Sequence, residues 1–168
     1  YNPLYLPEGA DPQAMAERVF ATFENDLENQ YYRDMARELW ESLVVAGAST
    51  GKQLIMRDMY AAICDEDAMD VLLDQATDRA AVRILQNRLS KLGDKAAQTY
   101  TGLVAALSRY KHPAINVYNP DIVLEDVVDQ GQIVCFSLSG TQYQIQSRAI
   151  GLIVLQHLQH LGGLRQGD

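Results

Sequence analysis

The run Ile133-Val134-Cys135-Phe136-Ser137-Leu138 is the stretch that decides the fold, because it is short, apolar and rich in β-branched and aromatic residues. Gly131 precedes it, and Ser139-Gly140 follows it before a long helical pattern begins. This order predicts a buried strand, a turn and a helix. The chain upstream predicts helix almost throughout, so the strand has no expected partner for its backbone N–H and C=O groups. We therefore expect this chain to be a piece of a larger α/β protein.

Helix signals dominate the chain before that run. Apolar residues recur at helical spacing, capping residues and proline mark helix starts, and glycine or proline marks helix ends. Thr77, for example, is expected to cap the helix that ends near Leu92. Six helices are expected, beginning at Pro12 and then covering about 29–46, 54–63, 67–75, 77–92 and 94–111, with a connector and a short helical turn at 115–130. The expected organisation is an extended lead-in at 1–10, an all-helical domain at 11–120, and a connector with a strand–helix return at 121–168.

Length and composition set the broad class. The chain has 168 residues, which is enough for one domain or for one domain with part of a second. Hydrophobic residues make up 48% of it, so a sizeable core can be buried, and no apolar run approaches the roughly 18 residues of a membrane span. Cys64 and Cys135 lie far apart in apolar contexts, so we expect buried thiols in a reducing compartment and no disulfide.

The net charge of −8 is unevenly distributed along the chain. Residues 1–76 carry a net charge of −10, residues 77–112 carry +5, and residues 113–168 carry −3. An acidic domain repels phosphate overall, although a local basic face can still contact it. The basic segment is therefore either an ordinary solvated helix face or a DNA-contacting face. The candidate DNA contacts fall on two faces of a helical pattern, Arg79 and Arg83 on one, and Arg88, Lys91 and Lys95 on the other.

The segment Gly47-Ala48-Ser49-Thr50-Gly51-Lys52 has some likeness to a phosphate-binding loop. That loop needs G-x-x-x-x-G-K-[ST] between a strand and a helix. Here three residues separate the glycines, Gln53 takes the place of the magnesium-binding hydroxyl, and a helix precedes the segment. We expect a glycine-containing turn between two helices and no nucleotide cofactor bound by this chain.

Other catalytic or metal-binding patterns are sparse. His157 and His160, spaced i, i+3, supply at most half a zinc site and are expected to be surface or boundary residues. Asp65-Glu66-Asp67 lacks the alternating spacing of a calcium loop and is expected to be a solvated helix start. No nucleophile elbow accompanies the hydroxyl residues near the predicted strand. We therefore expect no catalytic residue and no metal site in this chain.

Both ends of the chain carry patterns that resemble one family. Tyr1-Asn2-Pro3-Leu4, a later helix with Ala16-Glu17-Arg18-Val19, and Tyr32–Leu39, which fits W/Y-x-x-x-A-R-x-L, are similar to its opening. Residues 133–138, then Tyr143, Ala149–Val154 and Leu158, resemble its strand–turn–helix return. The chain thus resembles the coupling proteins of conjugative type IV secretion, the TraD/TraG class of ring-forming DNA-pump ATPases. The resemblance covers most of the chain, with the middle matched by helicity alone.

The resemblance implies a RecA-like α/β motor domain interrupted by a membrane-distal, all-helical domain. The fold class is then mainly α, a bundle of about six helices with a C-terminal strand–turn–helix that belongs to the motor domain. In that family the phosphate-binding loop precedes the interruption and the acidic magnesium motif follows it, so ATP and Mg would bind outside this chain. The implied assembly is a homohexamer at the cytoplasmic face of the bacterial inner membrane. Its implied partners are a relaxase or accessory protein of the relaxosome, and single- or double-stranded DNA.

Two functions compete at this point. In the first, the chain is the substrate-recognition domain of a DNA-translocating ATPase that drives conjugation. Its acidic half would dock a basic relaxase or accessory protein, and its basic helices would line the path of the transferred strand. In the second, the chain is a stand-alone helical adaptor, which requires residues 133–138 to find a partner within or between copies of the chain. An enzyme complete in this chain has the weakest support.

Overall fold

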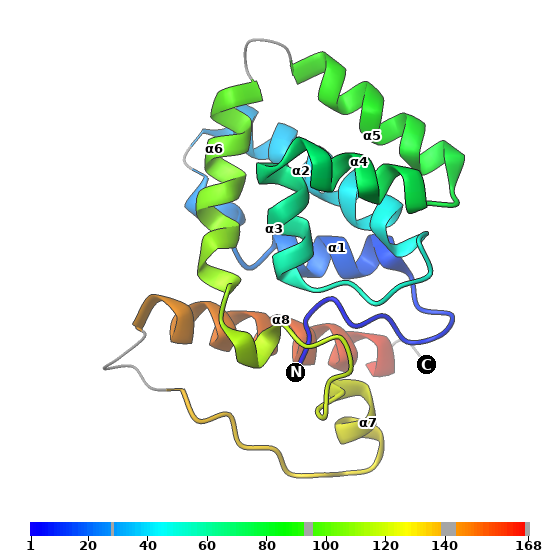
Figure 1. Cartoon of the computed structure of the whole chain (residues 1–168). Helices are drawn as coiled ribbons and strands as arrows, with labels where there is room; N and C mark the ends of the chain where they lie inside the picture. The colour runs from blue at the N-terminus through cyan, green and yellow to red at the C-terminus, as the bar shows by residue number, and fades with distance from the viewer. Residues whose placement is uncertain (28, 93–95, 139–143, 167–168) are drawn as a thin grey trace.

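The computed structural model describes residues 1–27, 29–92, 96–138 and 144–166 of the chain. Within these ranges the chain forms eight α-helices and no strand, which confirms the expectation of a mainly helical bundle (Figure 1). The six helices expected in residues 11–120 correspond to α1–α6. The α-helices are α1 (Pro12–Phe20), α2 (Gln30–Ala48), α3 (Met56–Cys64), α4 (Glu66–Gln75), α5 (Arg79–Leu92), α6 (Ala96–Leu107), α7 (Leu124–Asp129) and α8 (Gln144–Gln166). Three short 3₁₀ helices are η1 (Glu24–Asp26), η3 (Ser108–Tyr110) and η4 (Pro113–Ile115).

Local sequence signals explain most of the helix starts. The Asp11 carboxylate accepts a hydrogen bond from the Gln13 N–H at 2.9 Å, and Pro12 occupies the first helical position. Asp65 ends α3 and caps α4 at the same time, since its carboxylate accepts from the Asp67 N–H at 3.0 Å. One shared capping residue therefore sets the turn between α3 and α4.

The expected capping role of Thr77 is wrong, because Asp78 caps α5. The Asp78 carboxylate accepts from the N–H groups of Ala80 and Ala81 at 2.9 and 3.0 Å. The Thr77 hydroxyl instead donates to the carbonyl of Ser49, which ties the start of α5 to the end of α2. A carboxylate next to the helix also complements the helix dipole better than a neutral hydroxyl.

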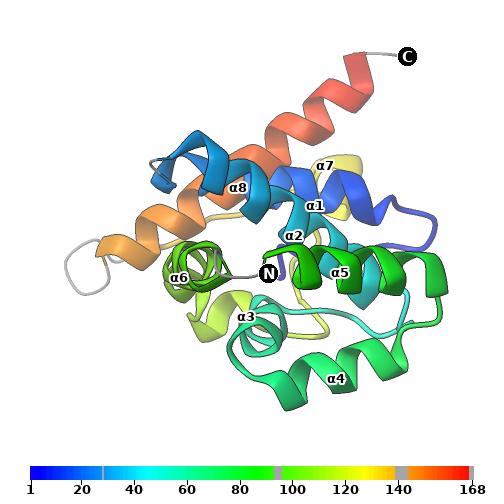
Figure 2. The same cartoon turned by 90° about the horizontal axis from the view of Figure 1, so that it is seen from above.

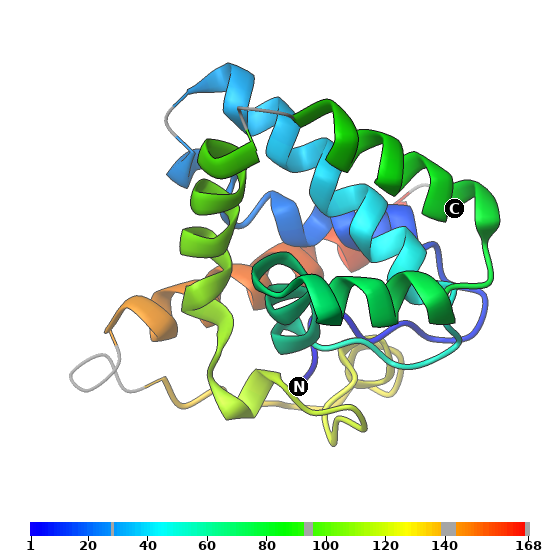
Figure 3. The same cartoon turned by 45° about the horizontal axis from the view of Figure 1, so that its top comes forward.

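Helix α2 is the centre of the core. It packs against α1, α5 and α6, and Figure 3 shows α5 running alongside it. The Trp40 side chain is fully buried, and its indole N–H donates to the Ala16 carbonyl at 2.8 Å. Phe23 contacts both Phe20 and Trp40 edge to face, with ring centroids 5.0 and 5.8 Å apart. These aromatic residues hold α1 against α2, as the apolar stripes in the sequence predict.

Helix α8 lies across one side of the bundle next to α1 and η3 (Figures 1 and 2). It is buried along a stripe that includes Ala149, Ile150, Ile153 and Val154. Figure 1 places α7 and the extended segment that follows it below α8. No helix in the described part of the chain is both long and apolar enough to cross a membrane.

The segment 132–138 differs from the predicted buried strand. It has no regular secondary structure; the Gln132 N–H donates to the Val127 carbonyl, and residues 133–138 make no backbone hydrogen bond to the described residues. Ile133 is 98% exposed, and only Val134 and Phe136 are half-buried. The expectation of burial is wrong within this chain because no neighbouring strand covers the segment or pairs with its backbone. The helix predicted after it is present as α8, and the intervening turn at 139–143 lies outside the described residues.

Both cysteines are exposed, so the expectation of buried thiols is wrong. Cys64 is the last residue of α3, where the helix ends at the surface. In an extended segment, successive side chains point to opposite sides. Val134 and Phe136 point inward and are half-buried, so Cys135 between them points outward. An apolar sequence context therefore did not predict burial at either position.

Candidate functional site

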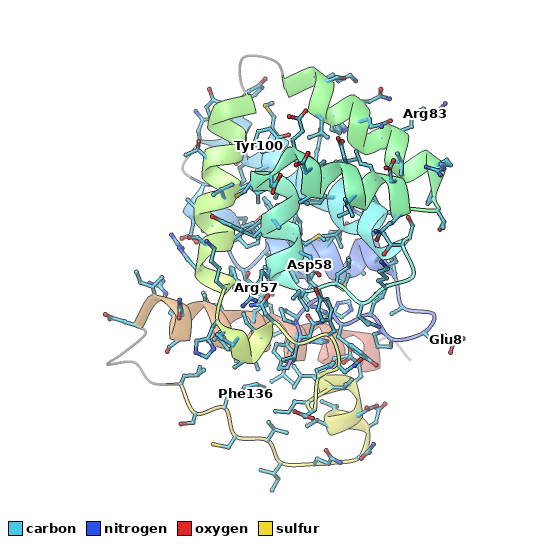
Figure 4. The ribbon with its side chains drawn as sticks, viewed as in Figure 1. Glu8, Arg57, Asp58, Arg83, Tyr100 and Phe136 are labelled. Atoms are coloured by element: carbon cyan, nitrogen blue, oxygen red, sulfur yellow. The ribbon has the colours of Figure 1, made fainter. Side chains whose placement is uncertain are left out.

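The predicted DNA-contact residues lie on α5 or just after it. Arg79, Arg83 and Lys91 are exposed, and Figure 4 shows Arg83 projecting away from the bundle. Arg88 is half-buried and forms an ion pair with Glu38 of α2, with 2.5 Å between the Arg88 Nη1 and Glu38 Oε2 atoms. Lys95 lies outside the described residues. Helix α5 therefore presents three exposed cations, while Arg88 is engaged by a carboxylate of the chain itself.

The apolar face of α5 fixes the direction of these cations. Val82 and Leu85 are buried against the core, and Leu89 packs on it partly buried. The exposed face contains one large apolar residue, Ile84, which is 50% exposed. The outer face of α5 is thus mainly polar and cationic, as a solvated helix or a phosphate-contacting helix would be.

An apolar depression with a volume of about 780 Å³ lies between α3 and α4. We call it the α3–α4 groove. Its walls also include the loop before α3 and the turn that carries Tyr118 and Asn119. Seven apolar residues line it, namely Leu54, Met59, Ala61, Ala62, Ala68, Val71 and Leu72. Val71 is 54% exposed, so this apolar surface opens to solvent.

Two carboxylates, those of Asp58 and Asp67, line the α3–α4 groove, and the surrounding sequence is acidic. Segment 52–75 contains six acidic residues against two cations, Lys52 and Arg57, and has a net charge of −4. The Lys52 ammonium donates to the Gln75 side chain at 2.8 Å, and the Tyr118 hydroxyl donates to the Asp58 carboxylate at 3.0 Å. Figure 4 labels Arg57 and Asp58 next to each other on α3. Burial raises the pKa of Tyr118, and its hydrogen bond to Asp58 raises it further.

Sequence reasoning missed this groove because its walls come from three separate segments. A signal was present in α4, where acidic residues flank the apolar positions Ala68, Val71 and Leu72. The apolar stripe of this short helix is wider than one neighbour can cover, so part of it stays exposed.

The segment Gly47–Lys52 contains the predicted turn between helices at residues 49–52, while its first two residues still belong to α2. Gly47 lies within α2, buried beside Leu54, and Gly51 has a positive φ of +72° that suits glycine. The N–H groups of residues 49–51 donate to backbone carbonyls, and the N–H of Lys52 donates to the Thr50 hydroxyl at 3.2 Å. A phosphate-binding loop needs such N–H groups to face its ligand. Here they are already used to end α2.

His157 contradicts its prediction as a surface or boundary residue. It is 2% exposed and has a hydrogen-bond partner at each ring nitrogen. Nδ1 lies 2.9 Å from the Tyr1 hydroxyl, and Nε2 lies 2.9 Å from the Glu125 carboxylate. Because a carboxylate can only accept, a neutral ring donates from Nε2 to Glu125 and accepts the Tyr1 proton at Nδ1. His160, by contrast, lies at the boundary as predicted.

The pKa directions in the Tyr1–His157–Glu125 cluster agree with this proton arrangement. Burial lowers the pKa of His157, although its hydrogen bond to Glu125 opposes this. Burial raises the pKa of the Tyr1 phenol, so the phenol keeps its proton. Burial also tends to raise the pKa of Glu125, but the hydrogen bond from His157 and the nearby Arg18 charge bring it below its ordinary value. The cluster therefore joins the first residue, α7 and α8 through a neutral histidine, and its phenol is poorly suited to act as a nucleophile.

The described residues contain no group of three or more His, Cys, Asp or Glu side chains placed to hold a metal ion. The chain therefore presents two surfaces with recognisable chemistry, the cationic face of α5 and the α3–α4 groove. Comparison of the chain with protein-family models, with curated proteins and with solved structures gives no match.

Proposed function

We propose that this chain is the substrate-recognition domain of a DNA-translocating ATPase of the conjugative coupling type. The observation that carries the proposal is the position of two segments outside the helices, 1–7 and 132–138. The Tyr1 ring contacts the Phe136 ring edge to face, with centroids 5.9 Å apart. A helical domain inserted into a motor domain needs its incoming and outgoing segments side by side in this way.

The exposed state of segment 132–138 supports the same proposal. Residues 133–138 are rich in β-branched and aromatic residues, have no backbone hydrogen bond to the described residues, and include Ile133, which is 98% exposed. These features fit a strand whose neighbours lie in another part of a larger protein. In this proposal that part is the RecA-like sheet, and α8 is the helix that follows the returning strand. The motor would bind ATP and Mg outside this chain, as a hexamer at the cytoplasmic face of the bacterial inner membrane.

In this proposal, the two charged regions of the chain bind different partners. The acidic half of the chain, residues 1–76, would dock a basic relaxase or accessory protein by charge complementarity. The exposed cations Arg79, Arg83 and Lys91 would contact the phosphates of the transferred DNA. Because Arg88 is paired with Glu38, its contribution to DNA contact would be smaller.

The test is to sequence the parent gene on both sides of the segment that encodes this chain. A strand with G-x-x-x-x-G-K-[ST] before Tyr1 and an apolar strand ending in acidic residues after Asp168 are expected. The purified full-length product should then hydrolyse ATP and form rings. A start codon at Tyr1 with a stop codon after Asp168 would contradict the proposal.

A second function, a stand-alone helical adaptor, is favoured by the α3–α4 groove, which needs no motor to bind a partner. In this case residues 133–138 would pair with a second copy of the chain. Sedimentation of the wild type and of Ile133→Lys distinguishes the two. Self-association that Ile133→Lys abolishes would favour the adaptor, and a monomer in both samples would count against it. The substitution should leave the fold intact, because Ile133 is 98% exposed.

A further inference from the structure

We infer that the α3–α4 groove binds a basic amphipathic helix of a partner protein. The inference deepens the proposed function and rests on it for the kind of protein that carries the helix. The residues that line the groove all belong to this chain, so binding to the groove can be tested without a motor domain.

The apolar part of the groove sets the first requirement on the occupant. Met59 and Leu72 are buried in its floor, while Val71 is 54% exposed at its opening. A volume of about 780 Å³ accommodates several apolar side chains. A ligand that removes Val71 and its neighbours from water is stabilised by their burial, at about 25 cal/mol per Å² of apolar surface.

The walls of the groove favour a helix over an extended peptide. Helices α3 and α4 form its two long sides, and none of its lining residues belongs to a strand. An extended peptide would leave its backbone N–H and C=O groups without a strand edge to pair with. A helix satisfies its own backbone and can place its side-chain ridges into the space between two other helices.

The charges around the groove favour a basic partner. Asp58 and Asp67 line the groove, and Asp70 and Asp74 are exposed on the same helix as Asp67. The ammonium group of Lys52, the one cation among the lining residues that the structure describes, is held by Gln75. Lysine or arginine side chains on the polar face of a bound helix would meet these carboxylates, whereas acidic side chains would be repelled.

Helix α5 of a second copy is a poorer occupant. It is the most basic helix of the chain, but its exposed face contains one large apolar residue among the described side chains, Ile84. One such side chain would cover little of the apolar surface formed by Met59, Val71 and Leu72. The partner helix should therefore present an apolar stripe of several residues, which α5 does not.

The experiment uses the whole chain and a synthetic probe peptide of about 18 residues, long enough to be partly helical alone. The probe has leucines at i, i+3, i+4 and i+7 and lysines on the opposite face. Fluorescence anisotropy gives its Kd, and backbone amide chemical shifts locate its site. We expect binding that shifts residues of α3 and α4, weakens at high salt, and falls about tenfold or more when the leucines are scrambled or the lysines are replaced by glutamates.

Variants of the chain complete the test. Val71→Lys should weaken probe binding about tenfold or more, because it places a charge in the apolar opening. Ile84→Lys is the matched control, since Ile84 is 50% exposed on α5, and should leave the Kd unchanged. Asp67→Asn combined with Asp70→Asn should weaken binding several-fold and reduce its salt dependence.

Four outcomes would overturn the inference. They are no binding at submillimolar probe, equal affinity for the scrambled or acidic peptide, equal effects of Val71→Lys and Ile84→Lys, and self-association of the chain that Val71→Lys removes. The last outcome would assign the groove to a second copy. If the peptide does not bind but the parent gene encodes motor segments, the groove inference fails and the proposed function stands. If the parent gene lacks motor segments but the peptide binds, the proposed function fails and the groove inference stands.

Discussion

Removal of the Tyr1 hydroxyl is the most direct test of the Tyr1–His157–Glu125 cluster. Tyr1→Phe keeps the ring, and with it the edge-to-face contact with Phe136, so it removes the hydrogen bond to His157 and little else. The Nδ1 atom of a 2% exposed histidine then loses its partner. A buried acceptor without a partner costs about 1–3 kcal/mol. For a chain of this length, 2 kcal/mol corresponds to a fall in Tm of about 4–8 °C.

The assay is thermal and urea unfolding of the wild type, Tyr1→Phe and Tyr118→Phe. Tyr118 is the matched control because its hydroxyl also donates a hydrogen bond, to Asp58, but the residue is 52% exposed. Water replaces that bond, so Tyr118→Phe should change the free energy of unfolding by less than about 0.5 kcal/mol. If both substitutions had this small effect, water would replace the lost partner of His157, and the conclusion that the Tyr1–His157–Glu125 cluster excludes water would be refuted.

Three further predictions concern pH, DNA and nucleotide. Because the pKa of folded His157 is lowered, protonation favours the unfolded chain, so stability should be complete above the unfolded pKa of about 6.5 and fall as the pH drops below it. His157→Gln should flatten this pH dependence in urea unfolding. Arg83→Glu with Lys91→Glu should weaken DNA binding and lower its salt slope by about two, whereas Arg88→Ala should have a smaller effect. An unchanged slope in the double variant would exclude the α5 face. Calorimetry should detect no micromolar ATP binding to the chain, and binding that Lys52→Ala removes would contradict the assignment of its loop as a turn.

The helices were predictable because their signals are local. The side chains of Asp11 and Asn29 accept hydrogen bonds from N–H groups two residues further along the chain, and Pro12 restricts its own backbone and that of Asp11. Leu39, Trp40 and Leu43 recur at helical spacing in α2, and all three are buried in the core. Such features depend on short stretches of sequence, which is why the six helices of residues 11–120 agree with the prediction.

The candidate site was less predictable because it depends on residues far apart in sequence. His157 is buried by contacts that include Tyr1, 156 positions away, and no local pattern contains that information. The α3–α4 groove likewise combines α3 and α4 with Tyr118 of a distant turn. The strand predicted at 133–138 shows the same limit, since its propensity is local but a strand exists only with a neighbour.

The link between Tyr1 and α8 also has a consequence for the order of folding. The contacts among α1–α6 join residues that all lie within 12–107, whereas the hydrogen bond between Tyr1 and His157 closes a loop of nearly the whole chain. Long loops cost more entropy to close, so this contact should form after the transition state. Substitutions at Tyr1 should then speed unfolding and leave the folding rate almost unchanged, which would make α8 the element that sets the kinetic lifetime of the folded chain.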